Sequence, residues 1–203
     1  MNISPSTAVR DLGVILDNTL SLDKYVSAIV KSCFFQLRQL KTVRKALSKS
    51  HVKTLLHAFI TSRVDYCNSL LVGLPLYQLD RLQLVLNAAA RLYANASSRA
   101  HVTGILRDDL HWLRITERIS YKLCILTYQC LHNCAPMYLS NYCVRLLDSS
   151  SRLSRNRSAA TGNLCTPRCK TKTYGPRSFR VSGPNSWNAL PAELKQDMPY
   201  PSN

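Results

Sequence analysis

The chain has 203 residues, of which 46% are hydrophobic, which is enough to build one folded domain or two small ones. Its 27 Lys and Arg outnumber 11 Asp and Glu and leave a formal net charge of +16. A surplus of this size favours polyanionic partners, nucleic acid first. The sequence has no glycine-rich phosphate loop and no nucleophile motif, so we expect no small-molecule substrate. No apolar run approaches the roughly 18 residues of a membrane-spanning helix. Arg10, Asp11 and Asp17 lie in the first twenty residues, where a secretory signal would need an uninterrupted apolar segment. We therefore expect an intracellular protein, nuclear or cytoplasmic, with no membrane partner.

The first expected element is a strand inside the stretch VRDLGVILDNTLSL, residues 9–22. Residues 12–16 are four aliphatic residues and one glycine, and Asp17, Asn18 and Thr19 close them with a turn. A buried strand needs neighbours, yet the next hundred residues are dominated by helical patterns. We therefore predict that residues 1–20 form one orphan β-strand and its turn.

Helical periodicity starts at Ser21, the expected N-cap, and continues to about residue 45. Second and third amphipathic helices are predicted over residues 50–71 and 77–95, separated by the breaker VGLP. Three helices with short connections predict a small bundle over residues 21–96.

A second helical segment is predicted over residues 97–147. It comprises a short helix at 102–108, a helix from Thr116 to about His132, and a last helix from Pro136 to about Leu147. The predicted fold class is thus mainly α.

Composition changes at Asp148, where a serine-rich and arginine-rich linker begins. Residues 148–203 are expected to be a basic, partly irregular C-terminal region. Within it, residues 164–170 and 177–182 are predicted to pair as a small hairpin, and residues 191–195 to form one turn of helix.

One face of the first helix is basic, because its cations fall within an arc of roughly 100° at about 100° per residue. The residues of this face are Lys24, Lys31, Arg38, Lys41 and Lys45. Such a face is typical either of a nucleic-acid contact or of an ordinary solvated surface, and both interpretations stay open at this point.

The eight cysteines are expected to be free thiols, since no secretory signal accompanies them. Two pairs have three residues between their members, Cys130 with Cys134 and Cys165 with Cys169. Zinc sites usually have tighter and more regular spacing, so no metal and no other cofactor is predicted.

Five stretches resemble, in order, the C-terminal third of reverse transcriptases from LINE-type non-LTR retrotransposons. The resemblance extends from about Val9 to Leu194. It is carried by VRDLGVILDNTLSLDKYV, HAFITSRVDYCNSLLVGLP, LQLVLNAAARL, DLHWLRITERISYKLCILTYQCLHNCAPMYLS and TYGPRSFRVSGPNSWNALPAEL.

The resemblance implies that Leu12, Gly13 and Val14 match the primer-grip strand, which in that family packs on the polymerase palm domain. The palm domain would be a missing partner here, and the helices that follow would be the thumb. A thumb grips a template and primer duplex through its backbone, with little reading of bases. The candidate contacts are Lys24, Lys31, Arg38, Lys41, Arg44, Lys45 and Lys53 in the helices, with Arg168, Lys170, Lys172 and Arg177 in the C-terminal region.

Polymerisation in that family needs paired aspartates, typically in a Tyr-x-Asp-Asp turn, that hold two magnesium ions. The sequence has no such turn, and its adjacent pair Asp108 and Asp109 is interpreted as charge at a helix end. We therefore expect no catalysis by this chain alone. Tyr174, Phe179 and Trp187 are interpreted either as stacking groups for a single strand or as core residues.

Some residues depart from the family pattern. Arg114 stands where proline is usual after HWL, the last residues replace a charged helix, and Cys165 and Cys169 are additional. The sequence thus predicts a non-catalytic fragment of an RNA-directed DNA polymerase that binds nucleic-acid backbone without sequence preference. Two alternatives stay open. One is a truncated or degenerate transposon-derived gene model with no independent function. The other is a domesticated helical adaptor that binds protein through an apolar patch exposed where the palm is missing, around Leu12, Val14 and Leu16.

Overall fold

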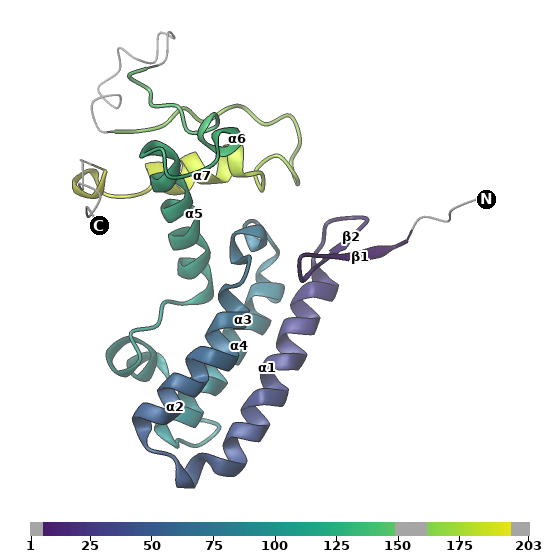
Figure 1. Ribbon diagram of the computed structural model, residues 1–203, viewed down its shortest axis with the longest axis vertical. Coiled ribbons are helices and arrows are strands. Elements are labelled where there is room, and N and C mark those ends of the chain that lie inside the picture. Colours follow the sequence, from purple (N-terminus) through teal and green to yellow (C-terminus); the bar gives the residue numbers. More distant parts are fainter. Residues whose placement is uncertain (1–5, 149–161, 196–203) are drawn as a thin grey trace. The chain divides into compact units, whose positions relative to one another are not determined.

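The computed structural model describes residues 6–148 and 162–195 (Figure 1). In this part of the chain the fold is mainly helical with one β-hairpin before the first long helix, so the predicted fold class is confirmed. Contacts divide the chain into two compact units, Met1–Arg118 and Ile119–Asn203. Among the described helices, none combines the length and apolar character needed to cross a membrane.

The N-terminal strand has a partner, so the prediction of an orphan strand was wrong. β1 (Ala8–Asp11) pairs antiparallel with β2 (Val14–Asp17), with Asp11 opposite Val14. Leu12 and Gly13 form the two-residue turn between them, both with positive φ, as hairpins with the native twist require. The partner was missed because the β1 residues are mostly exposed and lack the alternation of a half-buried strand.

The Asp17 carboxylate joins the hairpin to α1 (Asp23–Val43). It accepts hydrogen bonds from the backbone N–H groups of Thr19, Ser21 and Leu22, at 3.2, 2.9 and 2.8 Å. The Thr19 and Ser21 hydroxyls donate to it as well. These bonds, that from the Thr19 hydroxyl foremost, hold the pKa of Asp17 well below its ordinary value. Asp17 therefore anchors the start of α1, where Ser21 had been predicted as the N-cap.

The helices of the first unit form a bundle around α1 and α4 (Leu76–Ala94), which lie side by side (Figure 1). The chain returns between them through α2 (Lys49–Leu56), a π-helical turn η2 (His57–Thr61) and α3 (Ser62–Asp65). The most completely buried side chains of the bundle come from all of these elements: Val26, Cys33, Leu56, Ile60, Val64, Leu82, Val85, Leu86 and Ala89. Three predicted helices therefore share one core.

The predicted helix over residues 50–71 does not run through to its end. Tyr66 is extended and Cys67 has a positive φ of 52°, after which a 3-10 turn η3 (Asn68–Leu71) follows. Tyr66 makes two tertiary hydrogen bonds at this break. Its hydroxyl donates to the backbone carbonyl of Leu12, and the backbone carbonyl of Tyr66 accepts from the Tyr25 hydroxyl. Such contacts outweigh helix propensity and leave no trace in the local pattern.

Residues 102–118 belong to the first unit. They include a second π-helical turn η4 (Ile105–Asp109), and they bury Leu106, Leu110 and Trp112. Arg118 forms an ion pair with Asp65 of α3 at 2.7 Å. The sequence had placed this stretch in a separate segment from the bundle.

The second unit is built on α5 (Ile115–Leu131), which begins in the first unit and matches the helix predicted from Thr116 to His132. α6 (Met137–Ser140) is much shorter than the predicted helix to Leu147. α7 (Phe179–Asn188) and a 3-10 turn η7 (Ala192–Leu194) complete the described part, and the turn matches the one predicted over 191–195. Residues 149–161 of the predicted linker, and residues 196–203, lie outside the described residues.

The predicted C-terminal hairpin is wrong. Leu164 forms an isolated bridge with Arg145 and packs in a core with Cys130, Cys143 and Trp187. The backbone of Leu164 is then paired by a side chain: its N–H donates to Asn188 Oδ1 at 2.8 Å, and Asn188 Nδ2 donates to its carbonyl at 3.0 Å. The side chain of Asn188 thus pairs both backbone hydrogen-bonding groups of Leu164, as a neighbouring strand would. The residues expected to form that strand, 177–182, lead into the start of α7 instead.

We predict that Asp17→Ala lowers the free energy of unfolding by about 1–3 kcal/mol, because it leaves N–H groups at the α1 entry without an acceptor. Because the folded pKa of Asp17 is lowered, its carboxylate stabilises the fold above the unfolded pKa of about 3.9 and loses this effect as pH falls further. Denaturant unfolding of wild type and Asp17→Asn, followed by circular dichroism from about pH 7 to about pH 2, should show the two curves converging at low pH. A constant difference at all pH values would contradict this role.

Candidate nucleic-acid interface

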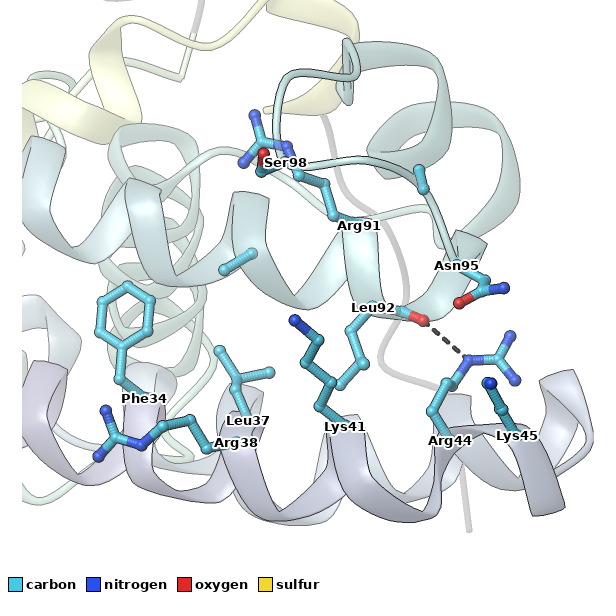
Figure 2. A pocket seen from close by; sticks show the side chains of 12 residues that line it. Phe34, Leu37, Arg38, Lys41, Arg44, Lys45, Arg91, Leu92, Asn95 and Ser98 are labelled. Atoms are coloured by element: carbon cyan, nitrogen blue, oxygen red, sulfur yellow. Dashed lines mark hydrogen bonds between the residues drawn. The ribbon is translucent and has the colours of Figure 1, made fainter.

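A groove of about 410 Å³ lies between the C-terminal halves of α1 and α4 (Figure 2). Five of its lining residues are basic and none is acidic. The basic residues are Arg38, Lys41, Arg44, Lys45 and Arg91. Its apolar lining comes from Phe34, Leu37, Ala88, Leu92 and Ala96.

The cations gather here because α1 and α4 run parallel. At the N-terminal ends of these helices, the guanidinium of Arg81 pairs with Asp23 at 2.9 Å and donates to the Ser27 hydroxyl at 2.7 Å. At the C-terminal ends, Arg44 reaches the last turn of α4. Parallel helices place both carbonyl ends together, and basic side chains are favourable there.

Arg44 holds this end of the bundle. Its Nε donates to the carbonyl of Leu92 at 2.9 Å, and its terminal nitrogens donate to the carbonyls of Tyr93 at 2.8 Å and Leu47 at 3.2 Å. Figure 2 shows the bond from Arg44 to Leu92 across the groove. Carbonyl acceptors fix the guanidinium without cancelling its charge, so Arg44 is both a structural group and a fixed positive charge.

The other cations differ in how firmly they are held. Arg91 donates from Nε to the carbonyl of Ala100 at 3.2 Å, which ties α4 to the loop that follows it. Arg38, Lys41 and Lys45 are exposed. In Figure 2, Lys41 and the Phe34 ring point from α1 toward α4. The groove thus combines two positioned guanidinium groups with three solvated cations.

Among the described residues, no ion pair compensates the charge of the groove. The sequence contains no Asp or Glu over residues 24–64 or over residues 82–107, which include most of α1 and the last two-thirds of α4. Within the described ranges, the ion pairs involve Arg81, Arg107 and Arg118, and all of these lie away from the groove. A concave surface of one sign over a low-dielectric floor concentrates the potential felt by an anion.

Four of the predicted contact residues are brought together in the groove: Arg38, Lys41, Arg44 and Lys45. Lys24 and Lys31 are exposed on α1 outside its lining. Lys53 lies on α2, where its ammonium donates to the carbonyl of Asp109 at 3.4 Å. The first helix therefore supplies the site mainly through its last three turns.

Arg91 was not among the predicted contacts. The sequence placed Arg91 in the predicted helix over residues 77–95 and in the stretch LQLVLNAAARL, with no role in binding. The absence of acidic residues around Arg91, over residues 82–107, was the signal in the sequence that could have found it.

The predicted contacts of the C-terminal region belong to the second unit and do not line the groove. Arg168, Lys170 and Lys172 are exposed, and Arg177 is half-buried. Of the three aromatic residues considered for stacking, Trp187 is 5% exposed and donates from Nε1 to the carbonyl of Gly162 at 3.0 Å. Phe179 packs against the same core, and Tyr174 is the exposed one of the three.

The paired acidic residues stand in the π-helical turn η4. Asp108 is exposed and pairs with Arg107 at 2.7 Å, and the hydrogen bond from that guanidinium lowers the pKa of Asp108. Across the described ranges, no three His, Cys, Asp or Glu residues are grouped closely enough to hold a metal ion. The cysteines of these ranges are unpaired thiols, and burial raises the pKa of Cys33 to about 11.

No protein-family profile matches the chain, and neither a curated protein nor a solved structure matches it either. The function proposed below therefore rests on the residues and geometry of the chain itself.

We predict that Arg44→Lys lowers the free energy of unfolding by about 1–3 kcal/mol, because one ammonium cannot reach the three carbonyls that the guanidinium bridges. The substitution keeps the charge, so thermal melting isolates the geometric effect. The control is Lys45→Ala at the neighbouring exposed position, which should change stability by about 0.5 kcal/mol or less. Equal melting of wild type and Arg44→Lys would contradict the clamp.

Proposed function

We propose that the chain binds the phosphate backbone of nucleic acid through the groove between α1 and α4, without preference for sequence. The observation that carries this proposal is the set of five basic residues lining one groove, with no acidic residue in its lining. The phosphodiester backbone of nucleic acid is a polyanion that matches such a surface, and its neutralisation by Lys and Arg supplies most of the affinity in non-specific binding.

The exposed basic side chains of the groove indicate how it would contact nucleic acid. Arg38 and Lys41 are exposed in the last turns of α1, and Lys45 is exposed in the 3-10 turn η1 (Arg44–Ala46) that follows it. Cations on a surface of this kind position a nucleic acid through its phosphates, whereas sequence is read by side chains that enter a groove of the duplex. We therefore propose binding of RNA and DNA alike.

The resemblance to LINE-type reverse transcriptases supports the same proposal. It would make α1, α2 to α3, and α4 the thumb of a polymerase, a part whose task is to grip nucleic acid. On this proposal the chain corresponds to a C-terminal region of an RNA-directed DNA polymerase, and the palm domain with its aspartates and magnesium ions would be a separate part.

The adaptor alternative is less well supported, because two of the three residues on which it was based are buried or half-buried. Of the three residues expected to form an apolar patch, Val14 is 5% exposed and Leu16 is half-buried, while Leu12 is 84% exposed at the hairpin turn. Of these three residues only Leu12 is exposed, and it is a small surface for a protein partner. The groove is the better supported site.

We predict that binding weakens steeply with salt, with a log-log slope of about −0.9 for each phosphate contacted on duplex DNA. Replacing Arg38, Lys41 and Lys45 together by Ala should make the slope less steep by about 2 to 3 and weaken binding to all sequences equally. Fluorescence anisotropy at several salt concentrations measures both quantities.

The matched control for this triple variant replaces Arg107, Arg114 and Lys122 by Ala, which removes the same charge from exposed positions outside the groove. It should retain most of the salt slope. Equal losses in the two triple variants would assign binding to net charge alone and remove the groove as its site.

We also predict that the purified chain does not extend a primer on an RNA or DNA template with magnesium and nucleotides present. The physical reason is that Asp108 is engaged by Arg107 on an exposed turn and, among the residues that the structure describes, belongs to no group of three side chains able to hold a metal ion. A gel-based extension assay with an active polymerase as positive control tests this. Extension that survives Asp108→Asn and Asp109→Asn would reveal another catalytic site.

A further inference from the structure

We infer that the groove between α1 and α4 takes one unpaired nucleotide of a single-stranded RNA or DNA, with the base on the apolar floor and the neighbouring phosphates on the basic rim. The inference rests on the proposed function, because it specifies which form of nucleic acid that site prefers. It follows from features of the groove that a surface for duplex backbone does not need.

The first feature is the apolar floor. Leu37 is 7% exposed at the bottom of the groove, and Phe34, Ala88 and Leu92 are half-buried along it. A duplex presents phosphates and sugars to a protein and keeps its base faces stacked inside, so it would leave this floor uncovered. A base in a single strand has a free face that can cover apolar side chains.

The second feature is the aromatic ring of Phe34. It stands on α1 and points toward α4 at the end of the groove where Arg38 also lies (Figure 2). An aromatic ring next to cations is the arrangement on which single-stranded binding proteins stack successive bases while they track the backbone. Phe35, the next residue, is 51% exposed and does not line the groove.

The third feature is size together with preorganisation. The volume of about 410 Å³ lies within the roughly 300–1,000 Å³ of sites for small ligands and is small for a helix or a duplex. Arg44 and Arg91 are held by carbonyls on the two sides of this space, so little conformational freedom is lost when they meet a phosphate. The groove thus fits a single nucleotide with its flanking phosphates.

The test compares the affinity of wild type, Phe34→Ala and Phe35→Ala for a labelled single strand and for its duplex, with RNA and DNA versions of each. Phe34→Ala should weaken single-strand binding by about 5- to 150-fold, the range for loss of one stacked base. Its duplex affinity and its salt slope should be unchanged. Phe35→Ala should bind both forms as wild type does.

A second measurement does not depend on truncating a half-buried ring. Phe34→Trp should bind single strands with its added fluorescence quenched by the stacked base, and an abasic single strand should not quench it. Phe35→Trp is the matched control and should show no quenching with either strand. Circular dichroism of every variant establishes that each is folded, and Phe34→Leu replaces Phe34→Ala if the latter unfolds.

The outcomes separate the inference from the proposed function. Salt-dependent binding that is the same for Phe34→Ala and wild type, or polyglutamate that binds as tightly as a single strand, overturns the nucleotide site. The first of these results leaves backbone binding intact, whereas the second replaces it with binding to any polyanion. Absence of binding to every nucleic acid at low salt overturns both.

Discussion

The parallel contact between α1 and α4 is the constraint on which the first unit depends. Two arginines fix it from opposite ends: Arg81 of α4 reaches Asp23 and Ser27 of α1, and Arg44 after α1 reaches the last carbonyls of α4. The buried side chains between these ends are mainly aliphatic, and hydrophobic burial has no preferred direction, so by itself it would allow the helices to slide along one another. Hydrogen bonds with defined partners set the register, and the register decides which cations face each other.

The same arrangement explains why the basic residues divide into two kinds. Carbonyl groups at a helix C-terminus lack partners within the helix, and guanidinium groups satisfy several of them at once. Arg44 does this at the end of α4, where it bonds the carbonyls of Leu92 and Tyr93. Arg91 is fixed in a different way, by the carbonyl of Ala100 in the loop that follows α4. Lys41 and Arg38 lie about one and two turns before Arg44, where helix carbonyls are already paired, so their charges stay solvated beside the fixed ones.

The helical periodicity of apolar residues made the long helices predictable from the sequence. The features that the sequence did not predict depend on contacts between residues far apart in the chain. α1, α4 and α5 begin and end within a few residues of their predicted bounds, because each has a continuous apolar stripe. The turn at Leu12 and Gly13, the break at Cys67 and the pairing of Leu164 by Asn188 each depend on partners that no local pattern contains. For the groove, α1 supplied a basic face that was visible in the sequence, but the approach of Arg91 required the parallel packing of α4.

Clustering cations without acidic neighbours has a thermodynamic consequence for the folded chain. Arg38, Lys41, Arg44 and Lys45 stand within three turns of one another, so their mutual repulsion opposes folding at low ionic strength. Any anion that enters the groove relieves this repulsion in the native state alone, because the extended chain spreads the same charges apart. Ligand occupancy and conformational stability are therefore linked: saturation at about 100 times the dissociation constant would add roughly 2.7 kcal/mol to the native state.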